Sequence, residues 1–148
     1  AIKHPRSKWA EWGVTRFDGK PLAKDALPAS LILPMGRNGP ALLAYENFDV
    51  YLKWNQSLSY AVTAAHLAAR IDGAPQLSRG KALVPVLTFE AAKELQRELI
   101  RLGYLQGEAD GKLGAATRTA VKKAQLKLAM PADSYPTAEL LQRLKTVR

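Results

Sequence analysis

The residues best suited to chemistry lie between Trp54 and Tyr60, where the sequence reads Trp-Asn-Gln-Ser-Leu-Ser-Tyr. An apolar run breaks at Asn55 and a helical pattern begins at Ser57, so these side chains lie at a corner between two elements. Side chains at such a corner are not buried by packing between elements, so they can line a cleft. The alternative is that Asn55 and Ser57 only cap and turn the chain.

Other residue types exclude several kinds of site. The chain has no cysteine, so it has no disulfide, no thiolate metal site and no cysteine nucleophile. His4 and His66 are far apart and lack further ligands, so we expect no metal and no cofactor. Gly36 and Gly39 resemble a phosphate-binding loop only superficially, because the Lys-Ser/Thr pair is missing, and we interpret them as a turn.

The elements that position the corner are predicted from periodicity. Residues 31–33 and 41–45 read as two strands joined by a glycine-rich turn, which indicates a β-hairpin. Residues 48–54 alternate apolar and polar side chains, which predicts a third strand with one buried face. Ser57 is a good N-cap for a helix whose apolar stripe continues until Gly73.

A second unit follows a linker. Residues 74–87 contain prolines and glycines without a clear period, which is typical of a connection between domains. Residues 88–148 show three helical patterns, the first beginning after Thr88 and the third after Thr137. The loop between the first two helices, residues 103–114, contains four glycines and is predicted to turn several times.

Charge narrows the kind of partner. The chain has 22 basic and 13 acidic side chains, a net charge of +9, which favours an anionic partner. No aromatic-basic RNA motif or DNA-recognition helix accompanies this charge, so we expect no nucleic-acid partner. No apolar stretch approaches the roughly 20 residues of a transmembrane helix, and we expect no membrane span in this segment.

The second unit is similar to the peptidoglycan-binding domain of bacterial cell-wall enzymes, a three-helix module. This resemblance implies that Tyr104, Asp110, Thr117 and Arg118 are candidates for contact with the peptide stems of the wall. The alternative for Asp110 and Thr117 is that they only cap the second helix. The chain departs from the family at Ala124 and at Asp133-Ser134, where an aromatic residue and Asp-Gly are usual. The motif residues are Leu95-Gln96, Leu102-Gly103-Tyr104, Gly107, Asp110-Gly111, Gly114, Thr117, Ala120 and Gln125.

The first unit, residues 1–73, resembles the closing part of the catalytic region of B-type (MltB-like) lytic murein transglycosylases. The resemblance implies an α+β fold, with a small antiparallel sheet and a helix from the end of a lysozyme-like region, followed by the three-helix domain. The matching motifs occur in order along the chain: Leu27-Pro28-Ala-Ser-Leu31, Pro34-x-Gly36-x-x-Gly39-Pro40-Ala41, Asn47-Phe48-x-Val50 and Trp54-Asn55-x-Ser57-x-x-Tyr60-Ala61.

The resemblance implies an enzyme that cleaves the β-1,4 bond between N-acetylmuramic acid and N-acetylglucosamine without water and leaves a 1,6-anhydro end. One glutamate serves the family as acid and then as base, in contrast to the paired carboxylates of ordinary glycosidases. That glutamate lies in a Glu-Ser-x-Phe-like motif on a helix upstream of the matched region. We therefore expect no catalytic residue in this chain; Glu46 imitates the motif, but we assign it to the strand pattern before any helix.

The corner residues then have supporting roles. The matched Trp-Asn-x-Ser-x-x-Tyr motif implies that Asn55 and Tyr60 line the cleft near the catalytic acid, that Ser57 belongs to the same wall, and that Trp54 stacks on a sugar ring. The alternative for Trp54 is core packing. The expected partners are glycan strands and peptide stems of peptidoglycan together with an upstream catalytic segment of the same protein. The expected location is the periplasm or cell envelope, and the alternative function is a non-catalytic peptidoglycan-binding protein.

Overall fold

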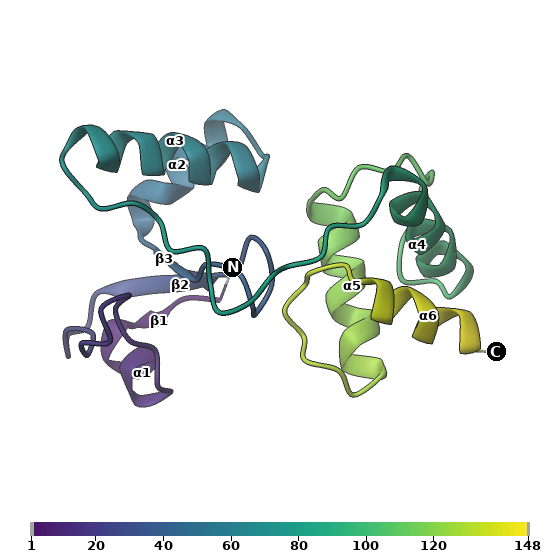
Figure 1. Cartoon of the computed structure of the whole chain (residues 1–148), viewed down its shortest axis with the longest axis horizontal. Helices are drawn as coiled ribbons and strands as arrows, with labels where there is room; N and C mark the ends of the chain where they lie inside the picture. The colour runs from purple at the N-terminus through teal and green to yellow at the C-terminus, as the bar shows by residue number, and fades with distance from the viewer. Residues whose placement is uncertain (1, 148) are drawn as a thin grey trace. The chain divides into compact units, whose positions relative to one another are not determined.

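The computed structural model describes residues 2–147, which form two compact units (Figure 1). The first unit comprises Ala1–Ile32 and Pro40–Gly80, and the second comprises Leu33–Gly39 and Lys81–Arg148. Within the described residues the first unit holds a small sheet and three helices, and the second holds three further helices. This arrangement confirms the predicted α+β fold class.

The sheet of the first unit has three antiparallel strands in the order β1-β2-β3. The strands are β1 (His4–Pro5), β2 (Pro28–Ile32) and β3 (Leu42–Ala44). Leu31 pairs with Leu43, so the predicted hairpin is correct. The short helix α1 (Arg6–Glu11) follows β1, and the indole N–H of Trp9 donates to the Ala29 carbonyl oxygen over 2.8 Å, which fastens α1 to β2.

The predicted third strand over residues 48–54 is wrong, because this segment is the helix α2 (Glu46–Trp54). Alternation at every second position also places apolar side chains four residues apart, so both periods were compatible with the sequence. The helix buries Phe48, which is 8% exposed, whereas Val50 is 64% exposed. Glu46 and Asp49 in the first turn and Lys53 in the last turn complement the helix dipole and favour the helix.

The helix α3 (Leu58–Ile71) has Ser57 as its N-cap, as predicted, and ends two residues before Gly73, whose φ is +85°. Its Ala61 is fully buried and packs with Ala44 and Phe48, so α3, α2 and β3 share one small apolar core. Ile32, Tyr51, Leu52, Leu58, Val62 and Ala65 pack around these three residues. This packing fixes the turn between α2 and α3 on which the candidate residues lie.

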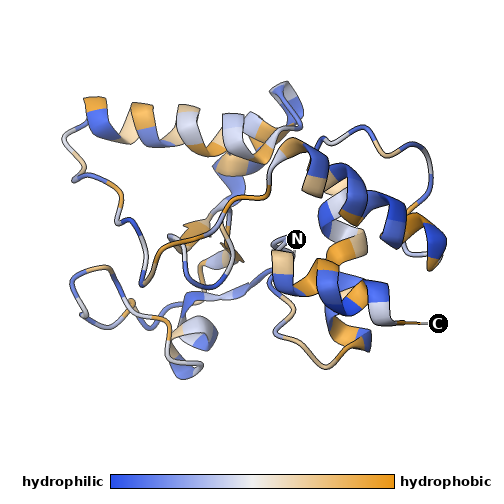
Figure 2. Ribbon diagram, turned by 45° about the vertical axis from the view of Figure 1, so that its right-hand side comes forward, coloured by the Kyte–Doolittle hydropathy of each residue, from blue (hydrophilic) through white to orange (hydrophobic). Residues whose placement is uncertain are grey.

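The second unit is the predicted bundle of three helices: α4 (Phe89–Arg101), α5 (Ala115–Lys127) and α6 (Ala138–Thr146). Thr88 and Thr137 cap α4 and α6 through their side-chain oxygens, as the sequence predicts. Apolar and polar residues alternate around each helix (Figure 2). The buried apolar cluster contains Leu95, Leu99, Leu105, Ala120, Val121, Ala124, Leu140, Leu141 and Leu144.

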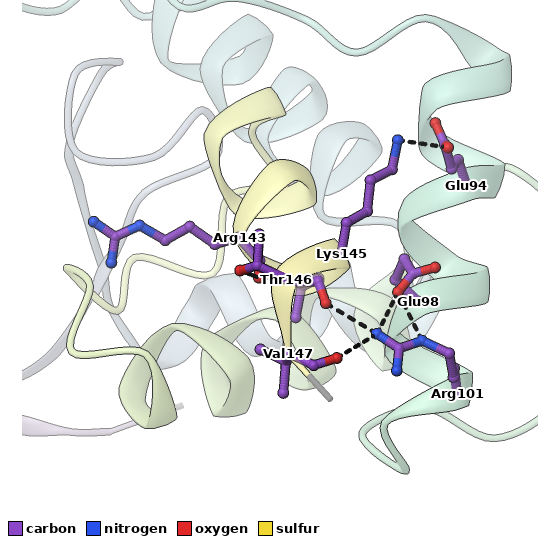
Figure 3. Close-up of polar contacts among 8 residues, drawn as sticks. Glu94, Glu98, Arg101, Arg143, Lys145, Thr146 and Val147 are labelled. Atoms are coloured by element: carbon purple, nitrogen blue, oxygen red, sulfur yellow. Dashed lines mark hydrogen bonds and ion pairs between the residues drawn. The ribbon is translucent and has the colours of Figure 1, made fainter.

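Polar contacts also tie α6 to α4 (Figure 3). The Arg101 guanidinium donates to the carbonyl oxygens of Leu144 and Val147, each over 3.0 Å, and pairs with Glu98 at 2.7 Å. Lys145 pairs with Glu94 at 2.7 Å. Because the last carbonyl groups of a helix have no partner within the helix, Arg101 supplies the missing donors for the end of α6.

Residues 74–87 contain no helix or strand. The domain boundaries that the sequence indicates, 1–73, 74–87 and 88–148, stay a prediction, because the contact-defined units place residues 74–80 in the first unit and residues 33–39 in the second. Across residues 2–147, every helix is too short or too polar to cross a membrane.

Candidate functional site

The corner between α2 and α3 is built from two capping interactions. Asn55 ends α2 in an extended conformation, and its Oδ1 accepts a hydrogen bond from the Ser57 backbone N–H over 2.9 Å. Ser57 in turn accepts from the Tyr60 backbone N–H at 3.4 Å and begins α3. The capping roles are therefore present, and they hold the corner in one conformation.

Three side chains at this corner still offer groups to a ligand. Trp54 is 85% exposed, so the alternative that it packs in the core is wrong. Tyr60 is 48% exposed. The Asn55 amide N–H₂ group makes no hydrogen bond within residues 2–147. The corner thus presents an indole ring, an amide donor and a phenol, which suit stacking and hydrogen bonding to a polar ring ligand.

The helix α2 carries two carboxylates, Glu46 and Asp49, both in its first turn, and Asp49 pairs with Lys3 at 2.7 Å. Glu46, which we predicted to precede no helix, is in fact the first residue of α2 and is exposed. It lies eight residues from Trp54, or about 12 Å along the helix axis. The carboxylate of Glu46 is therefore at the opposite end of α2 from the corner.

The first unit also contains an apolar hollow of about 500 Å³ over β3, α2 and α3. Phe48, Tyr51, Val62, His66 and Asp72 are among its lining residues. None of the four predicted corner residues lines it. Within residues 2–147 no group of three or more His, Cys, Asp or Glu side chains is arranged to hold a metal ion.

In the second unit, a buried glutamine of α4 organises the glycine-rich loop. Gln96 is 2% exposed, and its Nε2 donates to Asp110 Oδ1 at 2.9 Å, to the Lys112 carbonyl oxygen at 3.1 Å and to Thr117 Oγ1 at 3.2 Å. Its Oε1 accepts from the Gly111 N–H over 2.6 Å. The two N–H groups of the amide are shared among three acceptors, and its oxygen accepts one N–H, all within the unit.

A second buried glutamine, Gln125 of α5, holds the turn that follows α5 in the same way. Gln125, 3% exposed, donates from Nε2 to Asp133 Oδ1 at 2.8 Å and to the Tyr135 carbonyl oxygen at 3.3 Å. Its Oε1 accepts from the Ser134 N–H at 3.0 Å.

We define the Asp110 turn as residues 109–112 and the Asp133 turn as residues 132–135. Neither glutamine was among the predicted site residues, although the repeated Ala-Asp-Gly and Ala-Asp-Ser pattern indicates the pair of turns.

Asp110 and Thr117, both predicted as ligand contacts, lie close together because each accepts a hydrogen bond from Gln96. Asp110 Oδ1 also accepts from the Lys112 N–H at 2.9 Å. The hydrogen bond from Gln96, followed by that from the Lys112 backbone, lowers the pKa of Asp110 below its usual value. Thr117 is 3% exposed. The structure therefore shows a structural role for Oδ1 of Asp110 and for Thr117.

Arg118 is half-buried beneath residues 33–39, which belong to the same unit. Its Nη2 donates to the Pro34 carbonyl oxygen at 2.8 Å, and its guanidinium carbon lies 5.8 Å from the centre of the Tyr135 ring. Burial lowers the pKa of Arg118 and raises that of Tyr135. Arg118 therefore holds the Leu33–Gly39 segment in place. Tyr104 is half-buried against the apolar cluster.

Two family comparisons agree with the two units. Residues 1–69 match the family described as transglycosylase SLT domain, and residues 90–144 match the family described as putative peptidoglycan binding domain. The chain therefore combines a transglycosylase SLT domain with a peptidoglycan-binding domain, which confirms the resemblance predicted from the sequence. Both domains imply a location in the cell envelope.

Solved structures give the same assignment. The chain is similar to SltB3 from Pseudomonas aeruginosa in complex with NAG-anhNAM-pentapeptide, with 40% identity and a TM-score of 0.76 over 98% of this chain and 40% of that chain. SltB3 in complex with NAG-NAM-pentapeptide matches with 39% identity and a TM-score of 0.75 over 97% of this chain and 39% of that chain. The chain thus spans about 40% of the length of these relatives. No curated protein matches the sequence.

Proposed function

We propose that the protein is a lytic transglycosylase that cleaves the bond between N-acetylmuramic acid and N-acetylglucosamine in peptidoglycan. The observation that carries this proposal is the similarity to SltB3, at 40% identity over 98% of the chain, because that protein was solved in complex with NAG-anhNAM-pentapeptide. A 1,6-anhydro product distinguishes a lytic transglycosylase from a hydrolase. The proposed location is the periplasm, where such a substrate is found.

In the proposed reaction, a carboxylic acid gives its proton to the glycosidic oxygen, and the C1–O4 bond breaks. The O6 hydroxyl of the same muramic acid forms the new bond to C1, and the carboxylate accepts the O6 proton. This reaction consumes no water, so no second group is needed to activate one. A single carboxyl group is therefore sufficient, in contrast to the pair needed by hydrolytic glycosidases. An apolar surrounding would keep that acid protonated near neutral pH.

The corner supplies one wall for this substrate in our proposal. The exposed Trp54 ring stacks on a sugar, the N–H₂ group of Asn55 donates to an N-acetyl carbonyl oxygen, and the Tyr60 hydroxyl orients the catalytic carboxyl group. Ser57 holds the corner through its cap on α3. The acid itself is supplied by an upstream catalytic segment of the same protein, because Glu46 lies at the far end of α2.

The second unit is proposed to bind the peptide stems of the wall. Of its four candidate residues, Thr117, Arg118 and Oδ1 of Asp110 are engaged within the unit. Tyr104 and Oδ2 of Asp110 remain as the ligand contacts. The family matches end at residue 69 and resume at residue 90, which supports a linker within 74–87 between the domains 1–73 and 88–148.

The activity is tested on the protein that carries this segment together with a complete SLT domain. Digestion of purified peptidoglycan is expected to release muropeptides with 1,6-anhydromuramic acid, identified by mass spectrometry as 18 Da lighter than the hydrolytic products. Products with reducing ends would contradict the proposal. Asn55→Ala is expected to reduce turnover, whereas Gln56→Ala, a change at an exposed neighbour, is the matched control.

The match of residues 90–144 to a putative peptidoglycan binding domain favours a second function for the 148 residues alone, namely binding without cleavage. Sedimentation with insoluble peptidoglycan measures this binding directly. The chain is expected to sediment with the wall and to leave its muropeptide composition unchanged. If the chain stays in the supernatant, the proposed wall-binding role is wrong.

A further inference from the structure

The Asp110 turn and the Asp133 turn of the second unit are structural copies of each other. In each, the aspartate N–H donates over 3.1 Å to the carbonyl oxygen two residues before it, which belongs to Glu108 or Pro131. In each, the residue after the aspartate has a left-handed backbone, with φ of +77° at Gly111 and +63° at Ser134. Five residues after each aspartate a helix begins, at Ala115 or Ala138.

The inner carboxylate oxygen has the same partners in both copies. Oδ1 of Asp110 accepts from Gln96 Nε2 at 2.9 Å and from the Lys112 N–H at 2.9 Å. Oδ1 of Asp133 accepts from Gln125 Nε2 at 2.8 Å and from the Tyr135 N–H at 3.0 Å. The two aspartates are therefore held in one orientation, which leaves Oδ2 as the outward acceptor in each turn.

The two copies differ at this outward oxygen. Oδ2 of Asp133 accepts the Arg37 backbone N–H over 3.0 Å. Gly36 packs so closely that a Cβ placed on it would lie 2.7 Å from Tyr135 Cβ and 2.8 Å from Asp133 Oδ2. The Asp133 turn therefore binds a peptide N–H that follows a residue without a bulky side chain, and here the chain's own Leu33–Gly39 segment provides it.

The Asp110 turn is open at the equivalent position. Within residues 2–147, Oδ2 of Asp110 makes no hydrogen bond or ion pair, and the side chain is exposed. The Phe89 ring, 59% exposed, lies against Gly111 and gives the turn an apolar neighbour. Lys93 lies 5.3 Å from the centre of that ring, and neither it nor Lys112 forms an ion pair among the described residues.

We propose that Oδ2 of Asp110 accepts a backbone N–H from a peptide stem of peptidoglycan, in the way that Oδ2 of Asp133 accepts the Arg37 N–H. The preferred ligand has a small residue before the donating N–H, stacks against Phe89 and carries a carboxylate within reach of Lys93 or Lys112. This inference rests on the proposed wall-binding function and names the atom and the part of the ligand involved.

The substitution Asp110→Asn separates ligand binding from folding. The asparagine Oδ1 retains the acceptor for Gln96 and Lys112, but an N–H₂ group replaces Oδ2 and repels a peptide N–H. The matched control is Asp133→Asn, which makes the same change in the turn that the chain itself fills. It is expected to loosen residues 33–39 and to leave ligand affinity unchanged.

The test is a titration of the 148-residue chain with a soluble NAG-NAM-pentapeptide, followed by amide NMR. In the unaltered chain the Gly111 and Lys112 amide signals are expected to shift, and Asp110→Asn is expected to weaken binding about tenfold. A pentapeptide N-methylated at one amide at a time is titrated against the unaltered chain, so that the result does not depend on the folding of a variant. One methylated ligand is expected to lose affinity, because it lacks the required N–H.

The outcomes separate this inference from the function on which it rests. If the unaltered chain does not sediment with insoluble peptidoglycan, both the wall-binding role and the inference are wrong. If it sediments, but Asp110→Asn binds the pentapeptide as tightly as the unaltered chain, only the inference is wrong. Unchanged affinity for every N-methylated ligand would overturn it in the same way.

Discussion

Gln96 Nε2 and Asp110 Oδ1 lie 2.9 Å apart, which joins the middle of α4 to the loop that leads into α5. The amide of Gln96 also satisfies the Gly111 N–H and the Lys112 carbonyl group. A loop with several glycines has high conformational freedom in the unfolded chain, so it needs such contacts to hold one conformation. One buried side chain of α4 thus fixes the surface on which ligand contact is proposed.

Replacing Gln96 by Ala is expected to lower the free energy of unfolding of the second unit by about 2–3 kcal/mol, since several polar partners lose their hydrogen bonds in a buried site. Hydrogen exchange of the α4–α6 amides measures the effect in the full chain. Gln142→Ala is the control, because Gln142 is exposed on α6. Equal protection in both variants would contradict a structural role for the amide.

Ser134 adopts a left-handed backbone, with φ of +63°, a region that favours glycine. We therefore expect Ser134→Gly to stabilise the second unit by about 1 kcal/mol, because glycine reaches this region without steric cost. Ser134→Ala keeps the Cβ atom and is expected to give no gain. Chemical denaturation followed by far-ultraviolet circular dichroism compares the three chains, and a lower denaturation midpoint for the glycine variant would count against the argument.

The three helices of the second unit were predictable from their apolar stripes, with which the threonine caps of α4 and α6 and the glycine after α4 agree. Thr88, Thr137 and Gly103 occupy the predicted positions. By contrast, α2 was predicted as a strand. Phe48, Val50, Leu52 and Trp54 satisfy a period of two and a spacing of four equally well. The packing of Phe48 with Ala61 and the charges in the first and last turns favour the helix.

The position of the corner between α2 and α3 was predictable, but the surroundings of its side chains were not. The motif located the corner at Trp54-Asn55-Gln56-Ser57, and the exposure of Trp54 became clear only with the helical geometry of α2. Arg118 was predicted as a candidate for contact with peptide stems, whereas the structure shows it half-buried. Its contact with Pro34 joins residues 84 positions apart, and no local pattern in the sequence reveals such a pairing.

Asp110 makes the stability of the second unit sensitive to acid. Hydrogen bonds from Gln96 and the Lys112 backbone lower its pKa in the folded state. The folded state therefore binds fewer protons than the unfolded state, so the stabilisation is present above the unfolded pKa of about 3.9 and is lost as the pH falls through the lower folded value. Denaturation midpoints measured from pH 6 to pH 2 are expected to fall less steeply for Asp110→Asn than for the unaltered chain. Parallel pH profiles would show that Asp110 does not contribute.

Trp54→Ala separates a role in ligand binding from one in folding. Trp54 is 85% exposed, so its removal is expected to change the free energy of unfolding by no more than about 0.5 kcal/mol. Binding of peptide-free glycan strands is expected to weaken several-fold, because the sugar loses the apolar ring on which it stacks. Isothermal titration calorimetry on the protein with a complete SLT domain provides the affinity.

Two further variants give the Trp54 experiment its controls. Trp54→Phe keeps an aromatic ring and is expected to retain most of the affinity. Trp9→Ala removes a half-buried indole whose N–H donates to the Ala29 carbonyl oxygen, so it is expected to destabilise the first unit by about 2–3 kcal/mol. If Trp54→Ala destabilised the protein as strongly as Trp9→Ala, or bound glycan as well as the unaltered protein, Trp54 would have no place in the sugar-binding wall.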